Sequence, residues 1–128
     1  MKHLLSIILL LLAATAAMAA DVLVPVYVDS QKMNFTPAAR MRDGRTFVPL
    51  RDGAKAIGGT VNWDAKAKQA RICVGDRCTV IEAKQGINVG GHLLIPLRLM
   101  GEALGCGVQW SSAQHAVIIT RAKASTFR

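Results

Sequence analysis

Apolar and polar positions recur along the chain at an offset of 47 residues. Residues 44–74 align without a gap on residues 91–121. In each copy a short apolar run, at 46–48 or 93–95, ends at a proline. Proline suits the first turn of a helix, because its missing N–H would have no helical partner there. The pattern therefore predicts one short helix after each run.

The two predicted helices share an apolar stripe and a glycine stop. Leu50 and Leu97 each begin a series of apolar or small residues at i, i+4 and i+7, which is the spacing of one helix face. Gly58 and Gly105 follow the last apolar position and are expected to adopt the left-handed conformation of a helix cap. Each helix should therefore span about two turns.

After each glycine, apolar and polar residues alternate up to a tryptophan, which is the pattern of a half-buried strand. Val61 and Trp63 flank a polar residue, as do Val108 and Trp110. The alternation places both indole rings in the core, and the alternative is that they are exposed platforms on which sugars stack. A polar turn and a second apolar run follow each tryptophan and predict a hairpin.

A further hairpin precedes the first copy, formed by residues 22–28 and 33–35 around the polar turn at 29–32. Together these elements predict an α+β fold in which an antiparallel sheet is wrapped around short helices. The fold would consist of two tandem strand-helix-strand-strand half-units, at about residues 22–74 and 75–121.

The first twenty residues have the pattern of a signal peptide. Lys2 precedes an apolar run at 4–12 and a stretch of small residues at 13–20. The apolar run is shorter than the roughly 20 residues that cross a bilayer, which argues against an uncleaved anchor. We expect one exported domain at 21–121, periplasmic or extracellular, followed by a flexible tail at 122–128.

The chain carries a formal net charge of +8, and its basic residues are scattered rather than clustered. Scattered cations are typical of a solvated surface. A polyanion partner is the alternative, because a net positive charge attracts acidic polymers.

The three cysteines lie in the part of the chain that we expect to be exported, where disulfides persist. Cys73 and Cys78 flank a segment in which Gly75-Asp76 can form a two-residue hairpin turn, and this register places the two cysteines opposite one another. We therefore expect a Cys73–Cys78 disulfide. A redox-active pair is the alternative, but the spacing is not C-x-x-C.

Cys106 is left over and is expected to be a small buried residue, either free or paired between chains. The enzymatic alternative makes it a nucleophile with His115 as its base, although neither residue has a recognisable protease context. Apart from Cys73 and Cys78, no pair of cysteines or histidines has the close spacing of zinc ligands. A phosphate-binding glycine loop and a carboxylate pair are missing from the sequence. The sequence thus predicts no cofactor, no metal and no catalytic residue.

Arg51 and Arg98 occupy the first turn of the predicted helices, where the helix dipole disfavours a cation. We expect each guanidinium to bond backbone carbonyls or the carboxylate of a neighbouring strand. Ligand binding is the alternative role.

One longer motif runs from Gly44-Arg45-Thr46-Phe47-Val48-Pro49-Leu50-Arg51 to Val61-Asn62-Trp63-Asp64. It resembles the signature of the copper amine oxidase N-terminal-like (stalk) domain family. A weaker copy at 91–110 departs from that signature at Gly91-His92-Leu93, and Ser111 replaces the aspartate that follows the tryptophan. The signature positions of the two copies are Gly44, Arg45, Pro49, Leu50, Arg51, Gly58, Trp63, Asp64, Pro96, Leu97, Arg98, Gly105 and Trp110.

The resemblance covers nearly the whole of residues 21–121. It implies an α+β module that serves as the stalk of some bacterial amine oxidases and, more often, occurs in exported bacterial proteins without an oxidase. Copper and quinone chemistry is not implied, because the chain lacks an Asn-Tyr-Asp/Glu motif and its only tyrosine is Tyr27.

These observations predict a non-catalytic exported module that binds a protein or a cell-envelope polymer. An electrostatic polyanion-binding protein is the alternative, and a Cys106-dependent enzyme is the second alternative. If one half carries the binding surface, the more complete signature favours the half at Gly44–Asp64.

Overall fold

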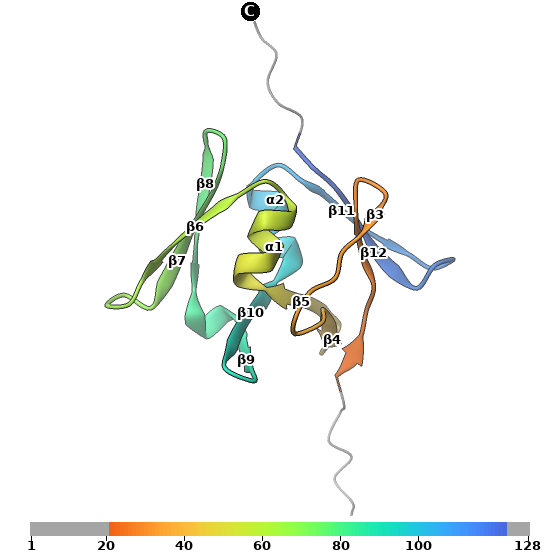
Figure 1. Cartoon of the computed structure of the whole chain (residues 1–128), viewed down its shortest axis with the longest axis horizontal. Coiled ribbons are helices and arrows are strands. Elements are labelled where there is room, and N and C mark those ends of the chain that lie inside the picture. Colours follow the sequence, from red (N-terminus) through yellow and green to blue (C-terminus); the bar gives the residue numbers. More distant parts are fainter. Residues whose placement is uncertain (1–20, 123–128) are drawn as a thin grey trace, which may run out of the picture.

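A computed structural model describes residues 21–122 as three sheets around two helices (Figure 1). The expected signal peptide, residues 1–20, lies outside the described residues, as does the expected tail at 122–128 except for Ala122. Within residues 21–122, neither helix is long and apolar enough to cross a membrane. The sheets are mostly antiparallel and the helices are short, which confirms the predicted α+β class.

The central sheet has five strands. In spatial order they are β1 (Val22–Leu23), β4 (Arg40–Arg42), β5 (Arg45–Pro49), β10 (His92–Pro96) and β9 (Ile87–Val89).

The antiparallel pairing of β5 with β10 lies in the middle of this sheet. Val48 lies opposite Ile95, and both side chains are fully buried. Pro49 and Pro96 end the two strands, and each is followed at once by a helix. Proline is tolerated at this junction, because the start of a helix does not need its N–H.

Two further sheets form arms on either side of the helices (Figure 1). One arm contains β6 (Thr60–Asp64), β7 (Gln69–Val74) and β8 (Arg77–Glu82), and the short 3-10 helix η2 (Ala83–Gln85) follows it. The other arm contains, in spatial order, β11 (Gly107–Ser111), β12 (Ala116–Thr120), β2 (Val26–Val28) and β3 (Gln31–Lys32). The pairing of β12 with β2 is parallel, and the other pairings are antiparallel.

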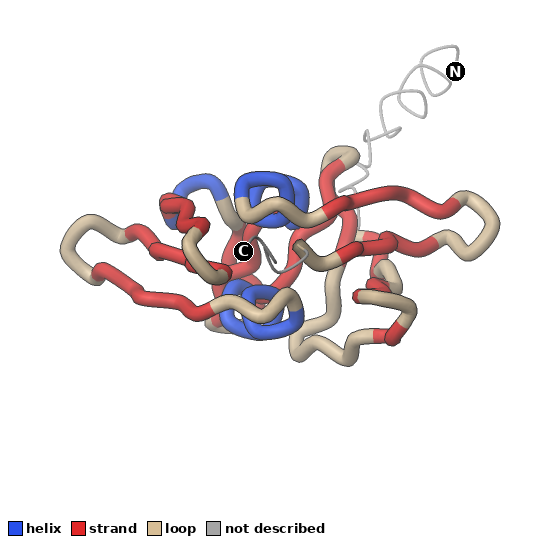
Figure 2. Tube along the Cα trace, turned by 90° about the horizontal axis from the view of Figure 1, so that it is seen from above, coloured by secondary structure: helices blue, strands red, loops and turns tan. Residues whose placement is uncertain are grey.

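The helices α1 (Leu50–Ala56) and α2 (Leu97–Ala103) begin directly after the two prolines, as predicted. Viewed from above, the two helices lie at opposite edges of the middle of the molecule, with strands between them (Figure 2). Gly58 and Gly105 follow their ends with φ of +81° and +84°, which confirms the predicted left-handed caps.

The core draws apolar side chains from the central sheet, both helices and both arms. Ile72 and Ile81 come from one arm and Ile119 from the other, while Met100 comes from α2. Within residues 21–122, no buried polar or charged residue interrupts this core. Burial of one such side chain stabilises the fold by about 1.5–3 kcal/mol.

The prediction that the two tryptophans lie in the core is wrong. Trp63 is 41 % exposed and Trp110 is 45 % exposed. Trp63 lies opposite the buried Ala70, and Trp110 lies opposite the buried Val117, so the alternation correctly assigns each ring to the inward face of its sheet. However, β6 and β11 are edge strands, and a large ring at a sheet edge stays partly in solvent.

The lead-in hairpin is shorter than predicted. Val28 lies opposite Gln31 across a two-residue turn, and Met33 and Phe35 fall outside the paired strand. Asp29 and Ser30 both have positive φ, which is the conformation of a tight type I′ turn. This turn moves the second strand two residues earlier. The preceding segment, β1, pairs instead with β4 in the central sheet.

The predicted Cys73–Cys78 disulfide is present. The two cysteines lie opposite one another in the β7–β8 hairpin, and Gly75-Asp76 forms the two-residue turn between the strands.

Gly86 allows η2 to pack closely on β10. A Cβ atom at this position would collide with the backbone carbonyl oxygen of Leu94 and lie 2.9 Å from Cδ1 of Leu93. A backbone atom inside a sheet cannot move aside as the end of a side chain can. The absence of a side chain at Gly86 therefore helps to position the residues of η2.

We expect Gly86→Ala to lower the free energy of unfolding by about 2–3 kcal/mol, because the added methyl overpacks the contact with β10. Gly44→Ala is the control, since Gly44 has a φ of +75° but no neighbouring atom within 4 Å of the added carbon. This variant should lose only the backbone cost of about 1 kcal/mol. Urea denaturation of both variants measures the difference, and a smaller loss for Gly86→Ala would contradict the packing argument.

An ion pair links Asp21, the residue directly before β1, to β4. The carboxylate of Asp21 accepts hydrogen bonds from Nε and Nη2 of Arg42, both at 2.7 Å, and Nη1 of Arg40 lies 3.8 Å away. The hydrogen bonds from Arg42, and then the positive charges of both arginines, lower the pKa of Asp21 below its ordinary value of 3.8. Because the folded pKa is the lower one, this pair stabilises the fold above pH 3.8 and is lost as the pH falls through the folded value.

We therefore expect Asp21→Asn to be less stable than the wild type at neutral pH, and the difference to shrink as the pH falls below about 4. Thermal unfolding from pH 7 to pH 2 measures it. Asp76→Asn removes a carboxylate from the β7–β8 turn and serves as the control. A wild-type advantage over Asp21→Asn that persists at the lowest pH would show that charge does not cause it.

Candidate functional site

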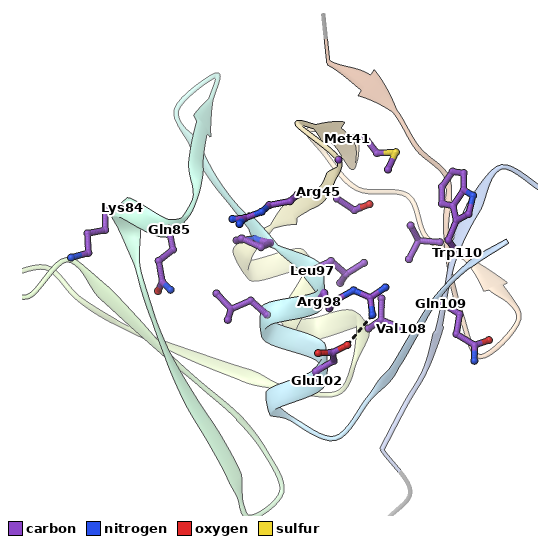
Figure 3. A pocket seen from close by; sticks show the side chains of 15 residues that line it. Met41, Arg45, Lys84, Gln85, Leu97, Arg98, Glu102, Val108, Gln109 and Trp110 are labelled. Carbon is purple, nitrogen blue, oxygen red and sulfur yellow. Dashed lines mark hydrogen bonds and ion pairs between the residues drawn. The ribbon is translucent and has the colours of Figure 1, made fainter. Parts of the chain in front are cut away.

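An open groove of about 790 Å³ lies beside α2 (Figure 3). We call it the α2 groove. It lies between the two arms and is lined by Met41, Gly44–Thr46, Lys84, Gln85, Pro96–Leu99, Glu102, Val108–Trp110 and Val117.

Side chains from distant parts of the chain face this groove. Figure 3 shows Trp110 on one side and Lys84 and Gln85 on the other, with Arg45 and Arg98 between them. Pairing of β5 with β10 creates this arrangement, because it brings the start of β5 beside the start of α2. The groove therefore exists only in the folded domain.

The α2 groove has more positive than negative charge. Nη1 of Arg98 lies 2.9 Å from Oε1 of Glu102, and Nζ of Lys84 lies 3.2 Å from Oε2 of Glu82, outside the groove. Arg45 has no hydrogen-bond or ion-pair partner among residues 21–122. Exposed ion pairs of this kind contribute little to stability and exchange readily with other anions. An anionic ligand would therefore find one unpaired guanidinium and two weakly engaged cations.

The groove also has apolar surface that the fold leaves uncovered. Trp110 is 45 % exposed and Leu99 is 42 % exposed, and both line the groove. A patch that combines apolar rings with polar side chains is typical of a binding site.

A second, smaller hollow of about 270 Å³ lies beside α1. We call it the α1 groove. It is lined by Thr36, Pro49–Asp52 and Gly91–Leu93. Residues 49–52 and 91–93 correspond, at the offset of 47, to residues 96–99 and 44–46 of the α2 groove.

The two grooves differ in their chemistry. His92 takes the place of Arg45, and Asp52 takes the place of Leu99. No tryptophan lines the α1 groove. The α2 groove is thus the better candidate for an anionic ligand with an apolar face.

The two helix arginines do not behave as predicted. Arg98 pairs with Glu102 one turn later in its own helix, and not with a backbone carbonyl or a neighbouring strand. Arg51 has no hydrogen bond or ion pair within the described part of the chain. Both arginines are exposed, so solvent can hydrate each guanidinium and a backbone partner is not required.

Other signature residues have structural roles. Oδ1 of Asp64 accepts the backbone N–H groups of Lys66 and Ala67, each at 3.0 Å, and so stabilises the β6–β7 turn. Trp63 does not line the α2 groove. Lys84, Gln85 and Leu99 do line it, and the signature gives no indication of them, because tertiary packing brings them there.

Cys106 is buried, as predicted, and its N–H donates to the carbonyl of Gly101 at 2.8 Å. His92 and His115 are both exposed. Among residues 21–122, no three His, Cys, Asp or Glu side chains form a group that could hold a metal ion. A buried thiol is shielded from a substrate, so this part of the chain gives the Cys106 hypothesis no support.

Residues 27–89 match the family model of the copper amine oxidase N-terminal domain. This part of the chain belongs to that family. The copper amine oxidase N-terminal domain is a non-catalytic accessory domain, which agrees with the absence of a catalytic signature in the sequence. The match begins in β2 and ends with β9, so the weaker copy of the signature at residues 91–110 lies beyond it. Comparisons with curated proteins and with solved structures found no match.

Proposed function

We propose that the protein is an exported, non-catalytic module that binds a negatively charged cell-envelope polymer in the α2 groove. The observation that carries this proposal is that one groove is lined both by the guanidinium of Arg45, which has no partner within the described residues, and by the exposed ring of Trp110. Cations in a groove attract an extended anion, and an uncovered ring adds apolar contact area once the ligand is bound. The signal-peptide pattern of residues 1–20 supports a periplasmic or extracellular location.

The domain itself is proposed to consist of two half-units around the β5–β10 pair. Val48 and Ile95 lie opposite one another and also correspond at the offset of 47. Two equivalent antiparallel strands that pair at equivalent residues imply an approximate twofold axis between them. The correspondence between the linings of the two grooves supports the same axis.

Binding by net charge alone is the second candidate. The chain has a formal charge of +8, and cations outside the groove would then contribute as much as those inside it. A comparison of substitutions inside and outside the groove therefore distinguishes binding in the α2 groove from binding by net charge alone.

The test introduces a carboxylate into the groove. Leu99→Glu places a negative charge on an exposed groove residue of α2, whereas Val80→Glu places the same charge on β8, at a side chain that is 51 % exposed and outside the groove. We expect Leu99→Glu to weaken binding to purified envelope fragments about tenfold, because the new carboxylate repels the ligand. Val80→Glu should change binding less than about twofold. Co-sedimentation over a range of fragment concentrations gives the affinities.

Two outcomes would contradict the proposal. Equal weakening by both variants would favour binding by net charge. Loss of binding after protease treatment of the fragments would identify a protein as the partner and overturn the assignment to a polymer.

A further inference from the structure

The flat ring of Trp110 restricts which anion fits the α2 groove. Trp110 ends a cross-strand row that continues through Val117 and Val26, both of which are buried. The row directs the indole inward from the sheet edge, and 45 % of the residue remains uncovered beside the groove. An indole offers a large, rigid and apolar face, which complements the flat C–H face of a pyranose ring.

The cations of the groove indicate a carboxylate. The guanidinium of Arg45 is unpaired within the described residues, and that of Arg98 has only an exposed partner, Glu102. A guanidinium binds a carboxylate through two parallel N–H donors, which fixes the orientation of the carboxylate as well as its position. Lys84 adds a third positive charge on the other side of the groove, so an extended ligand would meet cations along its length.

The remaining polar side chains provide partners for hydroxyl groups. Glu102 offers carboxylate oxygens that can only accept hydrogen bonds, and Gln85 and Gln109 offer amides that both donate and accept. A simple polyphosphate has no hydrogen-bond donor for Glu102, and a polyglutamate has only its backbone N–H groups. A sugar ring has several hydroxyl groups.

We propose that the α2 groove binds a linear polysaccharide whose sugar rings carry carboxylates, with one ring stacked on Trp110 and the carboxylate of another ring along the polymer held by Arg45. This inference rests on the proposed function, since it names the ligand class of the same groove. It requires a ring and a negative charge in one ligand.

Three soluble probes separate these two requirements. Oligogalacturonate has sugar rings with carboxylates, maltohexaose has sugar rings without charge, and an oligoglutamate peptide has carboxylates without rings. Calorimetric titration of the purified full chain should show binding of oligogalacturonate at least tenfold tighter than binding of either other probe. Equal affinity for oligoglutamate would overturn the inference in favour of an acidic peptide or of charge alone.

The chain provides matched controls for both contacts. Trp110→Ala should weaken oligogalacturonate binding roughly tenfold, which corresponds to one aromatic stacking contact, while Trp63→Ala removes the other exposed tryptophan, outside the groove, and should have little effect. Arg45→Ala should weaken binding more than Arg71→Ala, which removes the same charge from an exposed position on β7. Equal effects within either pair would overturn the proposed pose.

Failure of this inference differs from failure of the proposed function. If no probe binds tightly but Leu99→Glu still weakens binding to envelope fragments, the groove is the site and the acidic-sugar assignment is wrong. If Leu99→Glu has no effect on fragment binding, the site itself is wrong.

Discussion

The antiparallel pairing of β5 with β10 determines where the other elements lie. Val48 and Ile95 meet at its centre and are fully buried. Each strand passes directly into a helix through a proline, so the angle between the strands also sets the positions of the helices. The hairpin that follows each helix forms or begins an arm, and the two arms extend to opposite sides (Figure 1).

The same pairing creates the two grooves. It places the start of β5 beside α2 and the start of β10 beside α1, so each groove takes residues from both halves of the chain. The two grooves are lined by corresponding backbone segments, but their side chains differ. Arg45 occurs in one groove where His92 occurs in the other, and only the α2 groove contains a tryptophan.

Local features of this fold could be predicted from the sequence, whereas features that depend on distant contacts could not. The helix starts after Pro49 and Pro96 and the Cys73–Cys78 disulfide depend on a few neighbouring residues, and all were predicted correctly. The exposure of Trp110 depends on β11 being an edge strand, which alternation cannot indicate. The groove was not predicted, because Lys84 reaches it only through the packing of η2 against β10.

The parallel pairing of β2 with β12 has a consequence for the order in which the domain can form. Tyr27 pairs with Ile118, and the backbone N–H of Arg121 donates to Asp29, 92 positions earlier. During synthesis β2 emerges first among the strands of its arm, yet its neighbour β12 is made last. Contacts between such distant segments form slowly, because a long loop must close before they can stabilise the chain. The arm that carries Trp110 therefore cannot be completed until β12 has been made, and the α2 groove, which Val117 of β12 helps to line, cannot be completed before then.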